Sequence, residues 1–127
     1  MNINNGTYAG RLTRDVDLRH APSGTAIANI GLAINRRRKR GDEWVDEAVF
    51  VDVKLFGNRA EAFAKYHTKG SAACFPQCEL VYESWETKEG DKRSKLVLHA
   101  NGFEFVGARD GGSDAPAQAA AVTDTPF

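Results

Sequence analysis

The segment VFVDVKLF, residues 49–56, alternates with the two-residue period of a β-strand. One face carries only apolar side chains, those of Val49, Val51, Val53 and Leu55. The opposite face carries Phe50, Asp52, Lys54 and Phe56. A hydrophobic core accounts for the first set alone, so the second set needs a separate explanation.

The two phenylalanines on the polar face, Phe50 and Phe56, indicate a stacking surface. An aromatic ring beside Asp52 and Lys54 suits a flat apolar partner that brings charge, and a nucleobase on its phosphate chain is such a partner. The alternative is a second small core beneath a loop, with Asp52 and Lys54 at its rim. The strand by itself does not decide between these interpretations.

Length and composition predict one domain followed by a tail. With 127 residues, of which 42% are hydrophobic, the chain can bury one core, and we assign residues 1–108 to that domain. Residues 109–127 consist largely of Gly, Ser, Ala, Pro and Asp and cannot bury enough apolar surface to fold. We expect a flexible tail that ends in Asp124, Thr125, Pro126 and Phe127.

The formal net charge of zero hides a strong segregation of charge. Residues 1–40 contain eight Arg or Lys against two Asp, whereas residues 41–52 contain five acids and no base. Five of the bases are consecutive: Arg36, Arg37, Arg38, Lys39 and Arg40. This segregation favours a basic groove on a body kept soluble by acidic surface, and a salt-bridged loop is the alternative.

The two cysteines, Cys74 and Cys78, are too few for a disulfide scaffold and lack the further ligands of a structural zinc site. On one strand they would stand about 13 Å apart, beyond the roughly 7 Å that a disulfide can bridge, so we expect reduced thiols and no metal or cofactor. The sequence has no signal peptide and no apolar run near the ~20 residues of a membrane helix. A cytoplasmic location is expected.

The remaining patterns predict a β-rich body. Strands are expected at Asn5–Thr13, at Ala73–Tyr82 and at Lys95–Val106. Another strand turns Ala26, Ala28, Ile30, Leu32 and Ile34 toward the core. Residues 36–43 are too polar and too repulsive to pack, so we expect an exposed, mobile hairpin loop there.

One short helix is expected after Gly57. Asn58 is the expected N-cap, with Glu61 in the capping-box position, and helical spacing continues until Gly70. His67 lies on the inward stripe near the helix end, where we expect a structural histidine rather than a ligand or a catalyst.

The connection at residues 83–94 is expected to be a charged hairpin loop that presents Trp85. Its bases Lys88, Lys92 and Arg93 repeat the combination of an aromatic ring with cations that Phe50 and Lys54 show. We expect these four bases to contact phosphates. Alternatively, the Trp85 ring packs back on the hairpin stem.

Three strands, a helix and two strands is the element order of a five-stranded OB barrel, an all-β fold. Five motifs carry a resemblance as well: GRLTRD at 10–15, PSGTA at 22–26, FGNRAE at 56–61, KGS at 69–71 and PF at 126–127. In this order and spacing they resemble the bacterial single-stranded DNA-binding protein family over nearly the whole chain.

The resemblance implies a homotetramer that binds single-stranded DNA without sequence preference and recruits replication, recombination and repair proteins through its last residues. Phe50, Phe56 and Trp85 match the base-stacking aromatics of the family. Where relatives often place another stacking tryptophan, this chain has the basic run 36–40, which would act as a clamp for phosphates or stack through arginine. Trp44 would be a stacking ring displaced along the loop.

Two segments depart from the family pattern. Residues 72–80 replace a Val-rich strand and hold one extra residue, so we expect a bulge with Pro76 on a sheet edge. The tail has only Asp114 and Asp124 beyond Asp110, fewer acids than relatives carry, so we expect a weak recruiting element.

Two alternatives come from other classes of protein. A protein-binding OB module of a primosome-like complex would keep the barrel but would not need exposed aromatics on two separate elements. An OB-fold nuclease would need clustered carboxylates for a metal, and the acids here lie mainly in loops without such spacing. We therefore expect a binding protein and not an enzyme.

Overall fold

The computed structural model of the chain describes residues 1–106 of the 127. The predicted tail, with its terminal segment 124–127, lies outside the described residues, as do the last two positions of the predicted domain.

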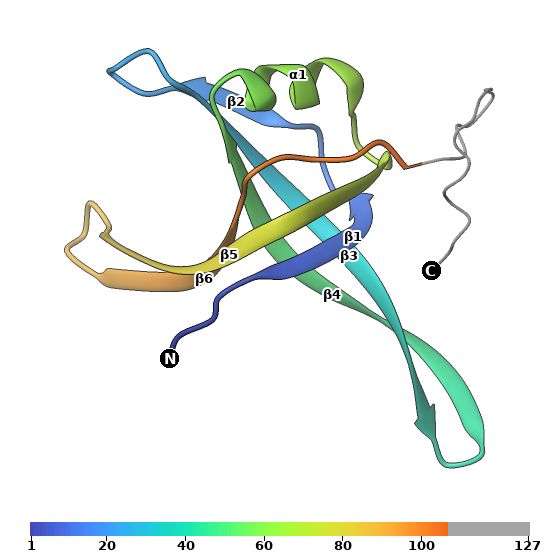
Figure 1. Cartoon of the computed structure of the whole chain (residues 1–127). Coiled ribbons are helices and arrows are strands. Elements are labelled where there is room, and N and C mark those ends of the chain that lie inside the picture. The colour runs from blue at the N-terminus through green and yellow to red at the C-terminus, as the bar shows by residue number, and fades with distance from the viewer. Residues whose placement is uncertain (107–127) are drawn as a thin grey trace.

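Five long strands form a closed barrel (Figure 1). In chain order they are β1 (Gly6–Leu12), β3 (Ala26–Arg40), β4 (Glu43–Phe56), β5 (Ala72–Glu86) and β6 (Lys92–Ala100). The sheet runs β1-β5-β6-β4-β3, and pairing of β1 with β3 closes it. A short strand, β2 (Asp17–His20), pairs only with β3. The prediction of a five-stranded barrel with one helix is confirmed, and β2 is an addition to it.

Closure brings the backbones of β1 and β3 into close contact at Gly10. A Cβ atom at this position would collide with the carbonyl group of Ala33, so only glycine allows the approach. All strand pairs are antiparallel except β4 with β6, which are parallel and join Lys54 to His99 in register. This parallel pairing places side chains of β6 next to those on the polar face of β4.

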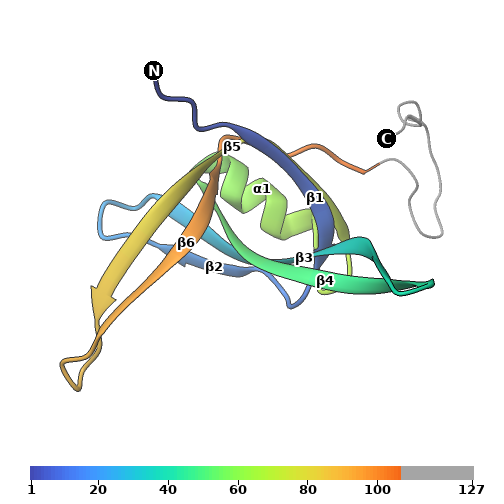
Figure 2. The same ribbon diagram turned by 90° about the horizontal axis from the view of Figure 1, so that it is seen from below.

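The core lies inside the barrel and is closed at one end by helix α1 (Asn58–Tyr66), which the strands frame when viewed along the barrel (Figure 2). As predicted, Ala26, Ala28, Ile30 and Leu32 are buried, and so are Val53 and Leu55. Each large side chain that is fully buried contributes roughly 1.5–3 kcal/mol of transfer free energy. The prediction fails at Val49, which is exposed because β4 continues beyond the end of the barrel.

The expected loop at residues 36–43 is instead the end of a regular two-stranded ribbon. Pairing of β3 with β4 continues to Arg40 and Glu43, and the turn contains Gly41 with a φ of 64°. The basic strand is not too repulsive to pair, because its partner supplies acids. Arg37 pairs with Asp46 and Arg38 with Glu47, at 3.7 and 3.2 Å.

The expected loop at 83–94 is likewise mostly strand. Pairing of β5 with β6 extends to Glu86 and Lys92, which places Trp85 on β5 opposite Arg93. Strand β6 ends at Ala100 and not at Val106 as predicted. Residues 101–106 leave the sheet, make one bridge to β5 through Glu104, and pack Phe103 against the core.

The helix also differs from its prediction at both ends. Gly57, with a φ of 75°, is the N-cap, and Asn58 is the first helical residue and makes no capping hydrogen bond. The helix ends at Tyr66, because His67 adopts an extended backbone. His67 is structural, as expected: it is buried, its Nδ1 lies 3.0 Å from the carbonyl oxygen of Phe63, and its ring stacks on Phe63.

The predicted bulge in β5 is confirmed. Tyr8 pairs with Phe75 and Gly6 with Cys78, so β5 has one more residue than β1 over this interval, and Gln77 takes a φ of 57°. However, β5 lies between β1 and β6 and not at a sheet edge. Both cysteines are free, and burial raises the pKa of Cys78 to about 11, which keeps this thiol protonated and unreactive.

Candidate nucleic-acid interface

The polar face of β4 is open and carries its two phenylalanines as exposed rings. Phe50 is 71% exposed and Phe56 is 40% exposed. A second small core would bury these rings. Phe50 is instead exposed, so residues 1–106 do not form a second core around it. Phe56 contacts one neighbouring ring, that of His99 on β6, edge to face at 5.1 Å between centroids.

A shallow hollow of about 340 Å³ lies beside Phe50. Arg14 and Lys95 contribute cations to its wall, and Gly31 forms part of its floor. A side chain at position 31 would collide with Thr13 and Arg14, so this glycine lets Arg14 lie across β3 toward β4. The hollow therefore combines an exposed ring with two cations from other strands.

Asp52 holds both of these cations over the face. Its carboxylate lies 2.7 Å from Lys95 Nζ and 3.6 Å from Arg14 Nη2. Burial raises the pKa of Asp52, but the hydrogen bond and charge of Lys95, together with Arg14, outweigh burial and lower this pKa below its usual value. Asp52 is thus an anion that positions two cations, and the cluster keeps one positive charge in excess.

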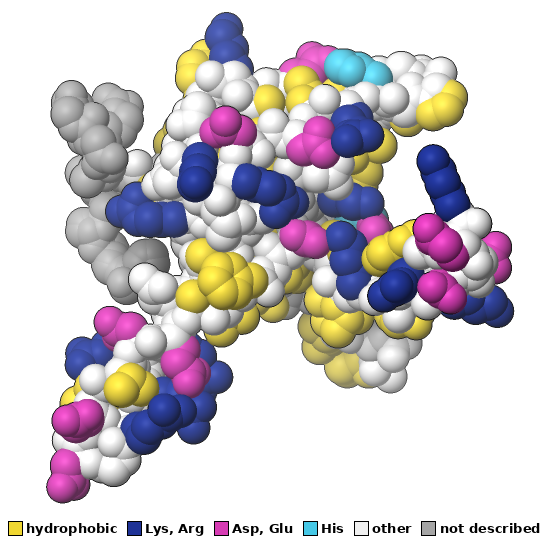
Figure 3. Space-filling model, turned by 180° about the vertical axis from the view of Figure 1, so that it is seen from behind, with side chains coloured by type: hydrophobic (Ala, Val, Ile, Leu, Met, Phe, Trp, Pro, Cys, Tyr) yellow, Lys and Arg dark blue, Asp and Glu magenta, His cyan; other side chains and the backbone are white. Residues whose placement is uncertain are grey.

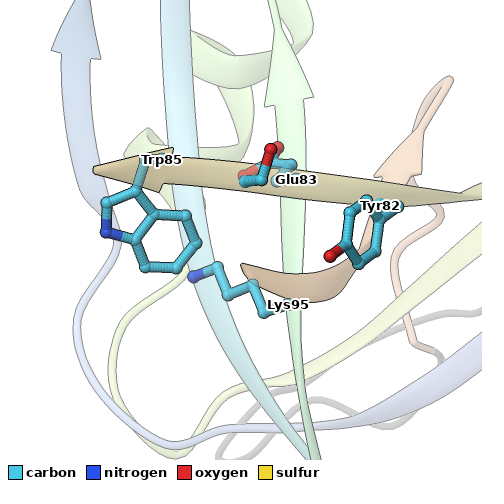
Figure 4. Close-up of a pocket in the computed structure, with 5 residues that line it drawn as sticks. Tyr82, Glu83, Trp85 and Lys95 are labelled. Atoms are coloured by element: carbon cyan, nitrogen blue, oxygen red, sulfur yellow. The ribbon is translucent and has the colours of Figure 1, made fainter. Parts of the chain in front are cut away.

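A second hollow, of about 600 Å³, lies beside Trp85 on the β5–β6 ribbon (Figure 4). Trp85 is 45% exposed, and Lys95 Nζ lies 5.7 Å from the centre of its ring. Tyr82 lines the same hollow. Because Lys95 lines both hollows, it connects the Phe50 surface with the Trp85 surface.

A third cluster of charges lies between Phe56 and Trp85. Glu83 accepts hydrogen bonds from Lys54 and His99, with ion-pair distances of 3.0 and 3.1 Å. Burial raises the pKa of Glu83, but these two partners outweigh burial and lower it. Lys54, predicted as a phosphate contact, is paired with a carboxylate in this structure.

The basic run at residues 36–40 is divided between the two faces of its ribbon. The register places Arg37 opposite Asp46 and Lys39 opposite Trp44, on the face that carries Phe50. Arg36, Arg38 and Arg40 alternate to the other face. Trp44 is 59% exposed, and the guanidinium of Arg37 lies 5.3 Å from its ring centre. Two cations, not five, thus share a face with the stacking rings.

The surface between the two ribbons brings apolar side chains and cations together (Figure 3). Of the predicted bases on the other ribbon, Lys92 and Arg93 lie on β6 opposite Glu86 and Trp85, and Lys88 lies in the exposed turn. Sequence reasoning missed Arg14, Lys95 and His99 as part of this surface. Lys95 and His99 are four residues apart on a strand and therefore share a face. This spacing points to the site only once β6 is known to pair with β4.

Within residues 1–106, no group of three or more His, Cys, Asp or Glu side chains is arranged to hold a metal ion. No helix in this part of the chain is long and apolar enough to cross a membrane.

The chain forms a closed five-stranded barrel with a helix between β4 and β5, which is the architecture of an OB-fold protein. Aromatic rings and cations are exposed along β4 and the ribbons, as is typical of a surface that binds nucleic acid. The model of the single-strand binding protein family matches residues 3–106. The chain therefore belongs to this family, whose members are DNA-binding proteins and not enzymes.

Curated relatives agree with the family match. The single-stranded DNA-binding protein of Wolinella succinogenes is 48% identical over 107 residues, covering 81% of this chain and 65% of that protein. That of Helicobacter hepaticus is 44% identical over 108 residues, covering 84% of this chain and 63% of that protein. The chain thus spans slightly less than two thirds of the length of these relatives.

A solved structure resembles the fold. It is a crystal structure of a deletion mutant of the single-stranded DNA-binding protein from Thermus aquaticus, with a TM-score of 0.72 and 25% identity. The similarity covers 84% of this chain and 52% of that chain.

Proposed function

We propose that the chain binds single-stranded DNA without sequence preference, by stacking bases on exposed rings and pairing phosphates with cations. The observation that carries the proposal is the arrangement of Phe50, Phe56 and Trp85 as exposed rings with Lys95 and Arg14 between them. Each base stacked on an aromatic ring contributes roughly 1–3 kcal/mol. Every base has an apolar face, so this mode of binding tolerates any sequence.

The spacing along β4 supports a single strand as the ligand. Trp44, Phe50 and Phe56 follow one another at intervals of six residues on the same side of the strand, or about 20 Å per interval. A flexible single strand can cover this distance with several nucleotides and turn selected bases toward the rings. A duplex hides the faces of its bases and cannot use the rings in this way.

The charge pattern supports phosphate contacts at defined places. Lys95 and Arg14 share one carboxylate, and Arg37 and Lys39 flank Trp44. Lys88, Lys92 and Arg93 would contact phosphates beyond Trp85. Each phosphate contact on a single strand adds about 0.7 to the slope of log affinity against log salt.

We also propose that the protein assembles as a homotetramer. On the β5–β6 ribbon, Leu80, Tyr82 and Leu96 continue the inward face of the barrel but are exposed. Exposed apolar side chains on a regular strand face favour association with another copy of the chain. Val49, on the β3–β4 ribbon, is a further exposed apolar side chain.

The segment Asp124–Phe127 is proposed to recruit proteins of replication, recombination and repair in the bacterial cytoplasm. A phenylalanine beside a carboxylate is a compact ligand for an apolar pocket with a basic rim. Removal of Thr125, Pro126 and Phe127 should leave DNA affinity intact. A comparison of proteins captured from nuclease-treated lysate by the full and shortened chains checks this, and identical captures would contradict it.

The test of DNA binding is fluorescence anisotropy with labelled oligonucleotides of equal length. We expect similar affinities for oligo-dT and for a mixed single-stranded sequence, and much weaker binding to the corresponding duplex. Equal affinity for the duplex would overturn the stacking mode. Absence of binding to any DNA would favour the alternative, an OB module that binds proteins.

A further inference from the structure

His99 lies on β6 in the barrel wall, on the same surface as the Phe56 ring that it contacts. Its side chain is 28% exposed. In the sheet it stands opposite Lys54 of β4 on one side and Glu79 of β5 on the other. Its ring contacts Phe56 edge to face, and its Nε2 lies 3.1 Å from the Glu83 carboxylate.

We propose that His99 is an additional DNA-contacting residue, which takes up a proton when a phosphate of single-stranded DNA binds beside Phe56. This inference rests on the proposed function and adds to it a named contact and a linkage between DNA binding and pH.

The hydrogen bonds of the ring explain why the proton matters. A carboxylate only accepts hydrogen bonds, so Nε2 of His99 carries the hydrogen that is donated to Glu83. In neutral His99 the other nitrogen, Nδ1, then has a lone pair, which repels a phosphate oxygen. Among residues 1–106 the structure gives Nδ1 no hydrogen-bond partner. Protonation turns Nδ1 into a donor that can bind phosphate without breaking the bond to Glu83.

The charges around His99 also favour its protonated form when a phosphate binds. The charged groups around His99 are Lys54 and Asp52 on β4, Glu79 and Glu83 on β5, Lys95 on β6, and Arg14, which shares Asp52 with Lys95. Three cations and three anions balance when His99 is neutral. The imidazolium form leaves one positive charge in excess, and a phosphate would stabilise that form.

The other two histidines do not share this environment. His67 is buried against Phe63, and desolvation lowers its pKa, which favours the neutral ring. His20 pairs with Glu61 of the helix at 3.5 Å, on the opposite face of the sheet from Phe56. His20 is therefore a control: it is another histidine beside a carboxylate, but it lies outside the proposed DNA surface.

The experiment measures the dissociation constant for labelled oligo-dT from pH 5.5 to pH 8.0 at constant ionic strength. Histidine changes charge between about pH 5 and 8. Since the bound phosphate favours the charged ring, affinity should rise as pH falls. We expect the dissociation constant to be about tenfold lower at pH 5.5 than at pH 8.0.

Three variants separate His99 from other causes of pH dependence. His99→Gln keeps a donor for Glu83 but cannot gain charge, so its affinity should change little with pH. His99→Lys should bind tightly across the range. His20→Gln should keep the full pH dependence of the wild type.

Two outcomes overturn the inference: no pH dependence in the wild type, or the same dependence in folded His99→Gln as in the wild type. A second test measures proton uptake by the wild-type protein and needs no variant. Calorimetric titration with oligo-dT at pH 6.5, in two buffers of different ionisation enthalpy, should show uptake of a fraction of one proton, and zero uptake would contradict the proposal. Failure of oligo-dT to bind at any pH would instead refute the proposed function.

Discussion

At the scale of single residues, the surface is organised by two carboxylates that each hold a pair of bases. Asp52 holds Lys95 and Arg14, and Glu83 holds Lys54 and His99. Long cationic side chains lose conformational freedom when they bind a phosphate. These ion pairs restrict the cationic side chains before DNA binds. The two carboxylates, however, compete with the phosphate for the same cations.

Phe50→Ala should weaken binding to single-stranded DNA by roughly 1–3 kcal/mol at every salt concentration, because it removes a stacking ring and no charge. The slope of log affinity against log salt should remain unchanged. Folding should be nearly unaffected, because Phe50 is 71% exposed. Binding titrations at several salt concentrations and a denaturant melt measure both effects.

The buried Phe63 provides the control for Phe50. Phe63→Ala should cost about 3–5 kcal/mol of unfolding free energy, as is usual for a phenylalanine removed from a core. If Phe50→Ala destabilised the fold comparably and left DNA affinity unaltered, the ring would be part of a core after all.

At the scale of elements, the two long ribbons determine which side chains can act together. Hydrophobic alternation was enough to predict β3 and β4 near the core, because the signal of Ile30 or Val53 is local. It could not predict the ribbon end at Arg37, which is stabilised by Asp46 across the strand pair. Such a pair becomes visible only once the register is known.

The same reasoning explains which part of the site sequence analysis found. Phe50, Phe56 and Trp85 break the expected pattern of their own segments, so they were identifiable without a fold. Lys95 and His99 are ordinary residues of a strand, and they join the site only because β6 pairs in parallel with β4. Strand neighbours far apart in sequence are a property of the tertiary fold.

The ribbon register leads to a prediction about the basic run. Replacing Arg37 and Lys39 with Gln should lower the salt slope by about 1.4, since two phosphate contacts would be lost. Replacing Arg36 and Arg40 removes the same charge from the opposite face and should change the slope much less. Affinity measured across a salt series compares the two variants. Equal changes would show that the face of the ribbon does not matter and that DNA responds to total charge alone.

At the scale of the whole molecule, two ribbons project from a small barrel (Figure 1). One of them exposes the apolar side chains of Leu80, Tyr82 and Leu96. We expect light scattering to give a mass about four times 13.9 kDa. Leu96→Asp should lower that mass, because a charge on the exposed inward face of the ribbon opposes its burial against another copy. Leu18→Asp on β2 is the control and should remain tetrameric. A monomeric wild type at micromolar concentration would refute the tetramer and leave DNA binding unaffected.

The most direct test of stacking on an exposed aromatic surface is the intrinsic tryptophan fluorescence during titration with oligo-dT. The chain has two tryptophans, Trp44 and Trp85. The variant Trp44→Phe leaves the fluorescence of Trp85 alone, and Trp85→Phe leaves that of Trp44 alone. We predict saturable quenching of the wild type by oligo-dT, loss of most of this quenching in Trp85→Phe, and its retention in Trp44→Phe. Equally strong quenching by duplex DNA of the same length, or an unchanged signal in Trp85→Phe, would contradict base stacking at this surface.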